Sequence, residues 1–222
     1  MSNITLVIPA KNEPESLPKV LNELKGFDVN KLIVMSKDDK ITLESIKDFK
    51  ENILFQSGKG FGNALREGIN SVNTKYFCVF NADGSFDPRD LKNLEEKLQT
   101  GSDFVFSSRY LKGAGSEDDT FLTSIGNFFF TQLCNLLFGL KISDVLYTYV
   151  MGSTKLFKNL DMVYDDFSFC VELPIRAKKK NYILADFHSF ERSRIAGIKK
   201  VNEFRDGFLI LISILRLLIF NK

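Results

Sequence analysis

Residues 76–85 read Tyr76-Phe77-Cys78-Val79-Phe80-Asn81-Ala82-Asp83-Gly84-Ser85, an apolar run that ends in an amide, a carboxylate and a glycine. The apolar residues predict a buried strand, and the polar residues predict a turn at its carboxyl end. Open α/β sheets bind ligands at that edge, and carboxylate and amide oxygens suit Mg²⁺ or Mn²⁺. The stretch therefore indicates either a metal site that carries a phosphate or an ordinary Asp-Gly surface turn.

The first half of the chain alternates between short apolar runs and amphipathic segments. Strands are predicted over residues 4–8, 31–35, 53–55, 76–80 and 104–106, and helices over residues 15–24, 41–49, 60–72 and 88–99. Continuous apolar strands separated by helices are typical of a parallel sheet that is covered on both faces. The fold class is therefore α/β, with a Rossmann-like, mostly parallel sheet flanked by helices.

The pattern changes beyond residue 109. Residues 111–120 hold two glycines and three acidic residues, which predicts a mobile loop. A long apolar helix is predicted over residues 120–138, and its polar residues form one narrow stripe: Thr123, Asn127, Thr131 and Asn135. The wide Phe/Leu face of this helix must be covered by the core, by a partner or by a membrane.

The last helix is predicted over residues 202–220 and is also amphipathic. Its apolar run, residues 208–220, contains Arg216 and falls short of the roughly 20 residues that a membrane span needs. Residues 176–222 carry a net charge of +7, whereas residues 1–175 carry −5. This basic tail favours a helix that lies on an anionic membrane surface over one that packs against the domain, a membrane partner protein or a second copy in a homodimer.

Cellular location and partner class follow from weaker signals. The three cysteines are scattered in apolar surroundings and are expected to be reduced core residues. No signal peptide is visible at the N-terminus, so the expected location is the cytoplasm, at the cytoplasmic face of the membrane. Nucleic-acid binding is not expected, because the basic residues lack interleaved exposed aromatic side chains and a known motif.

Two further turns are expected at the carboxyl edge of the sheet. Glu13 follows the first strand, where it can accept a hydrogen bond from a ribose hydroxyl or simply begin a helix. Gly58-Lys59-Gly60 precedes a helix, and its backbone N–H groups can bind phosphate or form a tight turn. This loop lacks the ending of a P-loop, so an ATPase is not supported.

These segments occur together in an order that resembles the family 2 glycosyltransferases, nearest to the dolichyl- and polyprenyl-phosphate mannosyl- and glucosyltransferases. The matching segments are residues 7–13, 58–68, 81–88, 107–110, 144–147, 172–177, 189–192 and 194–197. The resemblance implies a glycosyltransferase-A fold, a nucleotide-diphosphate sugar as donor, a divalent metal ion and an inverting reaction. It also implies a catalytic domain over residues 1–201, followed by the membrane- or partner-associated helix over residues 202–222.

The resemblance assigns donor and metal residues with one departure. Asp83 matches the second carboxylate of the family's Asp-x-Asp motif, and Asn81 stands in the first position. An amide oxygen brings no charge, so metal binding is expected to be weaker, and an inactive homologue that docks on a membrane protein is the alternative. The acidic loop that meets the nucleoside is replaced by residues 35–40, where Asp38 or Asp39 can substitute. The donor-binding set is Pro9, Ala10, Glu13, Ser36, Asp38, Lys59, Asn81, Ala82 and Asp83.

The acceptor decides the remaining roles. A polyprenyl phosphate or lipid-linked acceptor needs cations around its phosphate, and the candidates are Arg109, Arg192, Arg194, Lys199 and Lys200. A saccharide hydroxyl instead needs a general base, for which Asp144 and Glu172 are the candidates, although each can equally be a structural carboxylate paired with an arginine. The residues expected to take part in catalysis are Asp83, Asp144, Glu172 and Arg194.

Overall fold

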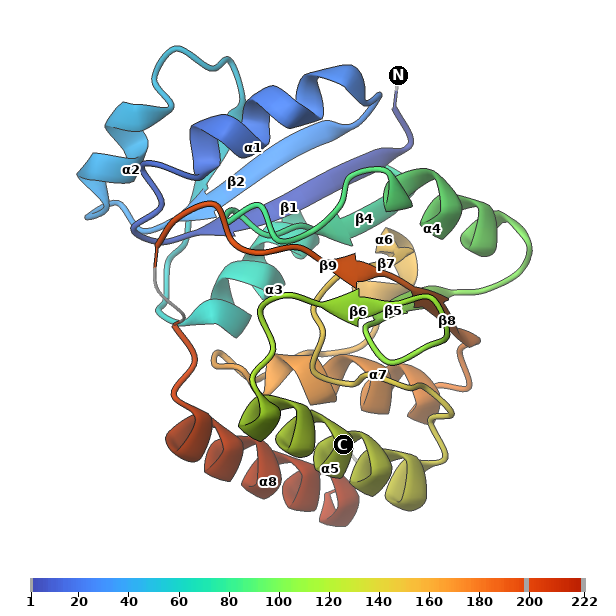
Figure 1. Ribbon diagram of the computed structural model, residues 1–222. Helices are drawn as coiled ribbons and strands as arrows, with labels where there is room; N and C mark the ends of the chain where they lie inside the picture. Colours follow the sequence, from blue (N-terminus) through green and yellow to red (C-terminus); the bar gives the residue numbers. More distant parts are fainter. Residues whose placement is uncertain (1, 198–199, 221–222) are drawn as a thin grey trace.

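The computed structural model describes residues 2–197 and 200–220. One seven-stranded sheet runs in the order β3 (Asn52–Phe55), β2 (Asn30–Met35), β1 (Ile4–Ala10), β4 (Tyr76–Val79), β7 (Val150–Ser153), β5 (Phe104–Ser108) and β8 (Leu184–His188). β7 is antiparallel to both neighbours, and all other adjacent strands are parallel (Figure 1). The predicted mostly parallel sheet is confirmed.

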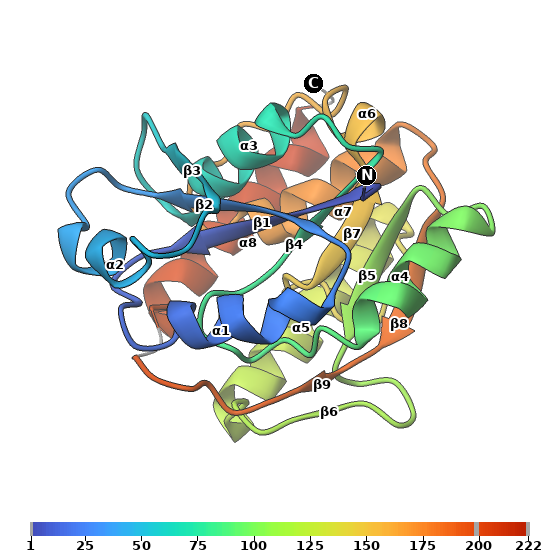
Figure 2. The same ribbon diagram turned by 90° about the horizontal axis from the view of Figure 1, so that it is seen from above.

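Helices cover both faces of this sheet. One face carries α1 (Leu17–Glu23) with its 3₁₀ extension η1 (Leu24–Gly26), α2 (Lys40–Ser45) and α4 (Asp90–Gln99), and the other carries α3 (Phe61–Ser71), α6 (Thr154–Phe157) and α7 (Phe169–Lys179) (Figure 2). Successive side chains of a strand point to opposite faces. Accordingly Leu6 and Ile8 enter one core, whereas Val7 enters the other.

The strand register brings three loops to one edge of the sheet. Ala10 pairs with Met35 on β2, and Val7 pairs with Val79 on β4. Because these strands are parallel, the loops that follow β1, β2 and β4 leave the sheet at the same carboxyl edge, as the sequence predicts.

Two local expectations were wrong or incomplete. Residues 111–120 are not a free loop: they contain β6 (Gly115–Ser116), which pairs in parallel with β9 (Phe190–Glu191), and Glu117 accepts hydrogen bonds from the Ser193 N–H and hydroxyl, both at 3.0 Å. The partner lies 76 residues later in the chain, so no local pattern reveals it. No strand was predicted at β7, which has only four residues and includes Gly152. No helix was predicted at α7 either.

α5 (Phe121–Phe138) and α8 (Glu203–Ile219) form an outer layer against α7 (Figure 1). Their polar residues turn inward. Asn127 Nδ2 donates to the Tyr110 hydroxyl at 2.8 Å, and the Val145 N–H donates to Thr131 Oγ1 at 3.1 Å. On α8 the inward polar side chains are Asp206 and Ser213.

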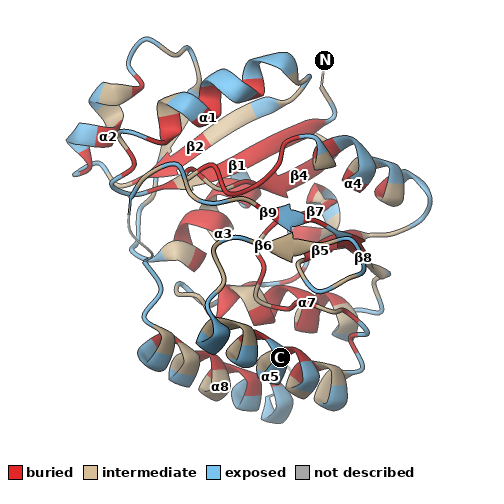
Figure 3. Ribbon diagram, viewed as in Figure 1, coloured by how far each residue is buried: buried red, intermediate tan, exposed pale blue. Residues whose placement is uncertain are grey.

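α5 and α8 bury part of their apolar surface in the core, through residues such as Phe130, Leu133 and Ile214, and expose the rest (Figure 3). This exposed apolar surface comprises Phe121, Leu122, Ile125, Phe128, Phe129 and Leu136 on α5, and Phe204, Phe208, Leu215, Leu218 and Ile219 on α8, with Phe220 after it. Phe121 is 84% exposed and Phe204 is 82% exposed. Among the described residues, α5 is the one helix that is long and apolar enough to cross a membrane by length and composition. The core therefore covers only part of the Phe/Leu face of α5, including Phe130, Leu133 and Leu137, and the rest of that face is exposed.

Candidate active site

The loops at the carboxyl edge are tied to one another by hydrogen bonds. The Asn12 N–H donates to Asp39 Oδ2 at 2.6 Å, and the Glu13 N–H donates to Thr42 Oγ1 at 2.8 Å. The loop after β1 is therefore fixed to the start of α2. Pro9 and Ala10 end β1 at the same edge. The edge thus gathers the sequence-predicted donor residues that follow β1, β2 and β4.

The turn after β4 presents one carboxylate and one amide. Asp83 Oδ1 accepts the Ser85 N–H at 3.0 Å, and Gly84 takes a positive φ of 83°, which a side chain would strain. Asn81 uses its Nδ2 to donate to Ser85 Oγ at 3.2 Å, which leaves its oxygen to face other groups. These hydrogen bonds leave Asp83 Oδ2 and the Asn81 oxygen as the two hard ligands of the turn.

This ligand set fits a divalent ion only together with a substrate. No group of three or more His, Cys, Asp or Glu side chains suited to a metal occurs within residues 2–197 and 200–220. Mg²⁺ is commonly held in nucleotide sites by one or two carboxylates plus substrate phosphates. Asp83 and Asn81 match that arrangement once diphosphate oxygens complete the coordination.

The two aspartates that were candidates for binding the nucleoside differ in burial and in their hydrogen bonds. Asp39 is buried as the N-cap of α2, accepting the Thr42 N–H at 3.2 Å, so it acts as a structural residue. Asp38 is exposed next to Ser36, whose hydroxyl accepts the Asp38 N–H at 3.3 Å. Of the two aspartates proposed as substitutes, Asp38 is the one whose side chain can reach a ligand.

The glycine-rich loop is already occupied. The Ser57 and Gly58 N–H groups donate to Glu67 at 2.8 and 3.3 Å, so they are not free for phosphate. A Cβ on Gly60 would lie 2.1 Å from the Asp165 carbonyl oxygen. The glycine there permits close packing against the segment before α7, and the loop offers a ligand the exposed Lys59 side chain rather than its backbone.

Arg109 lies inside a cluster of three carboxylates. Its Nε is 2.8 Å from Asp144 Oδ2, and its Nη1 is 3.2 Å from both Asp119 Oδ1 and Glu191 Oε2. The guanidinium also lies 4.7 Å from the ring centre of Tyr147. Burial lowers the pKa of Arg109, but the charges of Asp144, Glu191 and Asp119 more than offset this and hold the pKa well above its usual value. Burial in turn raises the pKa of Glu191. Arg109 thus ties β5, β9 and the start of α5 together.

Both candidate general bases are fully engaged in the interior. Asp144 accepts the Arg109 side chain at 2.8 and 3.1 Å and the Tyr147 N–H at 3.2 Å. Glu172 accepts the Val163 and Tyr164 N–H groups at 2.9 Å each, and Arg176 Nε at 2.7 Å. Neither residue is exposed at all. Of the two roles considered from the sequence, the structure favours the carboxylate paired with an arginine.

The basic segment after β9 runs past the turn that follows β4, at the carboxyl edge of the sheet. The Arg192 guanidinium pairs with Glu23 at 2.7 and 3.0 Å, and Arg194 Nε pairs with Asp118 Oδ1 at 3.1 Å. Arg194 Nη1 also lies 3.9 Å from Asp83 Oδ2. Lys199, another acceptor candidate, lies outside the described residues. Sequence reasoning missed the role of Asp118, although the acidic loop and the basic tail carry complementary charge.

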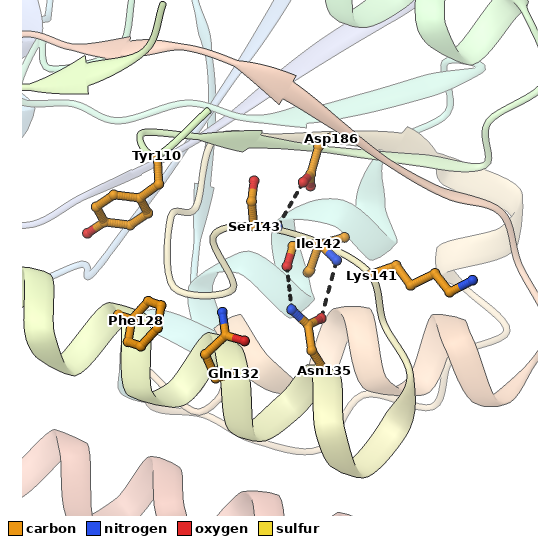
Figure 4. A pocket seen from close by; sticks show the side chains of 8 residues that line it. All are labelled: Tyr110, Phe128, Gln132, Asn135, Lys141, Ile142, Ser143 and Asp186. Carbon is orange, nitrogen blue, oxygen red and sulfur yellow. Dashed lines mark hydrogen bonds between the residues drawn. The ribbon is translucent and has the colours of Figure 1, made fainter. Parts of the chain in front are cut away.

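A separate cavity of about 410 Å³ lies between α5 and the ends of β5 and β8 (Figure 4). Asp186 Oδ2 accepts the Ser143 N–H there at 2.8 Å. The Asn135 side chain donates to the Ile142 carbonyl and accepts the Ile142 N–H. Asp186 Oδ1 is buried without a hydrogen-bond partner, and burial raises the pKa of this carboxyl group. No sequence signal singled out Asp186.

Comparison with known proteins identifies the family. Residues 5–161 match the family described as Glycosyl transferase family 2. The glycosyltransferase AglJ of Haloferax volcanii is 24% identical over 183 residues, which cover 80% of this chain and 59% of that protein. The dolichyl-phosphate hexose transferase of the same organism is 22% identical over 207 residues, which cover 92% of this chain and 89% of that protein.

Solved structures agree on the fold. Glucosyl-3-phosphoglycerate synthase from Mycobacterium tuberculosis, crystallised with Mn²⁺, UDP and glucosyl-3-phosphoglycerate, is similar with a TM-score of 0.75 at 15% identity, covering 96% of this chain and 78% of that one. The chain spans only about half the length of several curated relatives, for example 48% of an uncharacterised glycosyltransferase of Mycobacterium bovis. The chain belongs to glycosyl transferase family 2 and has the glycosyltransferase-A fold.

Proposed function

We propose that this protein transfers a sugar from a nucleotide-diphosphate sugar to a polyprenyl phosphate or another lipid-linked phosphate, with inversion at the anomeric carbon. The observation that carries the acceptor class is the burial of Asp144 and Glu172 in ion pairs with Arg109 and Arg176. A hydroxyl acceptor needs a positioned base to remove its proton, whereas a phosphate oxygen is already anionic. The names of two relatives, a dolichol-phosphate mannosyltransferase and a dolichyl-phosphate hexose transferase, support the same class.

The donor would lie along the carboxyl edge. Asp83 and the Asn81 oxygen would hold Mg²⁺ or Mn²⁺, which when bound neutralises the charge of the leaving diphosphate. Glu13, Ser36 and Asp38 would bind the nucleoside. The ends of β1 and β4, at Pro9, Ala10 and Ala82, would line the site, and Lys59 would reach it from the glycine-rich loop.

The reaction itself would require no proton transfer. An oxygen of the acceptor phosphate forms a bond to the anomeric carbon, the bond from that carbon to the diphosphate oxygen breaks, and its electron pair leaves with the nucleoside diphosphate. Arg192, Arg194 and Lys199 would supply positive charge to the acceptor phosphate. Arg109 would act on this chemistry indirectly, as a positioning residue that fixes Asp144 and β9.

The exposed apolar surface of α5 and α8 would lie on the cytoplasmic face of the membrane. Two helices with outward Phe and Leu side chains give an interfacial surface for an acceptor whose tail stays in the bilayer. α5 is held to the domain by Asn127, Thr131 and Asn135 along its length, which favours a helix that lies in the interface over one that leaves the domain to span. The alternative is that a membrane partner protein, or a second copy of this chain in a homodimer, covers this surface.

Isothermal titration calorimetry with UDP-, GDP- and other nucleotide sugars in the presence of Mn²⁺ tests the donor assignment. One of these donors should bind the wild-type protein, and Asp83→Ala should lose binding that depends on the metal while keeping its unfolding temperature. Asp48→Ala, an exposed aspartate on another loop, is the matched control and should bind as the wild type does. Equal binding by Asp83→Ala and the wild type would contradict the assignment.

A further inference from the structure

Residues 192–197, which directly follow β9, lie across the proposed donor site and are called the strap here. Its backbone is bonded to the turn after β4: the Arg192 N–H donates to the Ser85 carbonyl at 2.9 Å, and the Ile195 N–H donates to the Asp83 carbonyl at 2.8 Å. The Ile195 side chain sits over Gly84 so closely that a Cβ on the glycine would lie 2.4 Å from Ile195 Cδ1.

The strap also reaches the loop after β1. Ala196 and Gly197 line a cavity of about 260 Å³ together with residues 12–16 and Ile41. A Cβ on Gly197 would lie 3.3 Å from Glu13 Oε2, so the glycine backbone passes directly beside that carboxylate. Lys200 forms an ion pair with Glu13, whose carboxylate also accepts the Ser16 hydroxyl at 2.6 Å. The strap therefore covers both the metal side and the nucleoside side of the edge.

Each acidic donor residue faces a cation from this part of the chain. Arg194 Nη1 lies 3.9 Å from Asp83 Oδ2, and Lys200 is paired with Glu13. Glu13 and Asp83 are largely buried, with side chains 7% and 16% exposed. Buried carboxylates need a compensating charge or hydrogen-bond donor. In the free protein Arg194 and Lys200 provide that compensation, which the donor's metal ion and ribose hydroxyls would otherwise provide.

We propose that the strap and Lys200 close the donor site of the free protein as an internal plug, which the nucleoside diphosphate and its metal ion displace. This inference rests on the proposed function, since it assumes that Asp83 and Glu13 hold the donor. The nucleotide must break the Lys200–Glu13 pair to bring a ribose hydroxyl to Glu13, and must move Arg194 away from Asp83 to seat the ion. The apparent affinity for donor is then reduced by the fraction of protein whose strap is closed.

Lys200→Gln tests the plug by the sign of its effect. Removing the competing ammonium group should tighten binding of a nucleoside diphosphate with Mn²⁺ by up to about fivefold, the factor expected for loss of one partly exposed ion pair. The gain should shrink at high ionic strength, because salt already screens the pair in the wild type. Lys92→Gln, on an exposed lysine of α4, removes the same charge and should leave the affinity unchanged.

Weaker binding by Lys200→Gln would show that Lys200 is a ligand of the diphosphate, and unchanged binding would show that the pair does not close the site; either result overturns the proposal. If no nucleoside diphosphate binds the wild-type protein at all, the proposed function fails instead, so the two failures are distinguishable.

Amide hydrogen exchange supplies a second measurement on the wild-type protein. The Ile195 N–H, which is bonded to the Asp83 carbonyl, should exchange faster when a nucleoside diphosphate and Mn²⁺ are bound, because the strap has left the turn. Slower exchange at Ile195 would instead describe a lid that closes over the donor, and unchanged exchange would show that the strap stays in place. Either result would overturn the proposal that the strap is a plug.

Discussion

At the scale of single residues, the cluster around Arg109 shows how charge is handled inside this protein. One arginine faces three carboxylates, and burial of the surplus negative charge disfavours ionisation within the cluster. Glu191 is the group whose pKa is raised by burial, against the opposing charge of Arg109. The cluster therefore makes stability depend on pH.

The sign of that dependence follows from proton binding. Because the folded protein holds the Glu191 proton more tightly than the unfolded chain does, the stability from this group is complete below the unfolded pKa and is lost as pH rises through the raised, folded pKa. Urea unfolding of the wild type and of Glu191→Gln between about pH 4 and pH 7 measures it. Glu191→Gln should gain stability relative to the wild type as pH rises, and a difference that does not change with pH would contradict this.

The two buried carboxylates should behave as structural residues. Glu172→Gln removes the charge that faces Arg176, and Asp144→Asn removes the charge that faces Arg109. Breaking a buried pair costs on the order of 3–5 kcal/mol, so both variants should unfold at clearly lower temperature in calorimetry. The folded fraction that remains should still bind donor. An unfolding temperature equal to the wild type, together with lost turnover, would instead identify a general base and a hydroxyl acceptor.

At the scale of elements, sequence periodicity predicted α5 and α8 as helices but not which way their polar residues face. The polar stripe of residues 123, 127, 131 and 135 is visible in the sequence, yet its direction depends on Tyr110, Val145 and Ile142, whose backbone and hydroxyl groups bind it. These partners are set by tertiary packing. The same holds for β6, whose partner β9 is far along the chain.

The exposed apolar surface makes a prediction for membrane binding. Phe204→Glu combined with Phe208→Glu should lower partitioning onto anionic lipid vesicles by well over tenfold, since each buried Phe contributes roughly 2 kcal/mol. The unfolding temperature should not fall, because both side chains are exposed. Ile41→Glu, an exposed apolar residue on α2, is the control and should still bind. If the wild-type protein does not bind vesicles but forms a stable dimer, and the double variant is a monomer, the surface is instead the interface of a homodimer.

At the scale of the whole molecule, the carboxyl edge was the most predictable part of the site. Alternating strands and helices place the loops after β1, β2 and β4 together, so Glu13 and the Asn81–Asp83 turn could be assigned to one edge from the sequence. What covers that edge could not be predicted, because the strap approaches it from the far end of the chain and is held by single contacts such as Ile195 N–H to the Asp83 carbonyl. For the glycine-rich loop the sequence left phosphate binding and a tight turn open, and the hydrogen bonds from the Ser57 and Gly58 N–H groups to Glu67 favour the tight turn.

The central claim is sugar transfer to a lipid phosphate, and one assay tests it directly. The wild-type protein is mixed with the nucleotide sugar that it binds, Mn²⁺ and vesicles that contain either polyprenyl phosphate or the matching polyprenol, and the glycolipid product is measured. The account predicts a polyprenyl-phosphate sugar from the first vesicles, none from the second, and none from Asp83→Ala. Transfer to a soluble saccharide hydroxyl with no transfer to polyprenyl phosphate would contradict it.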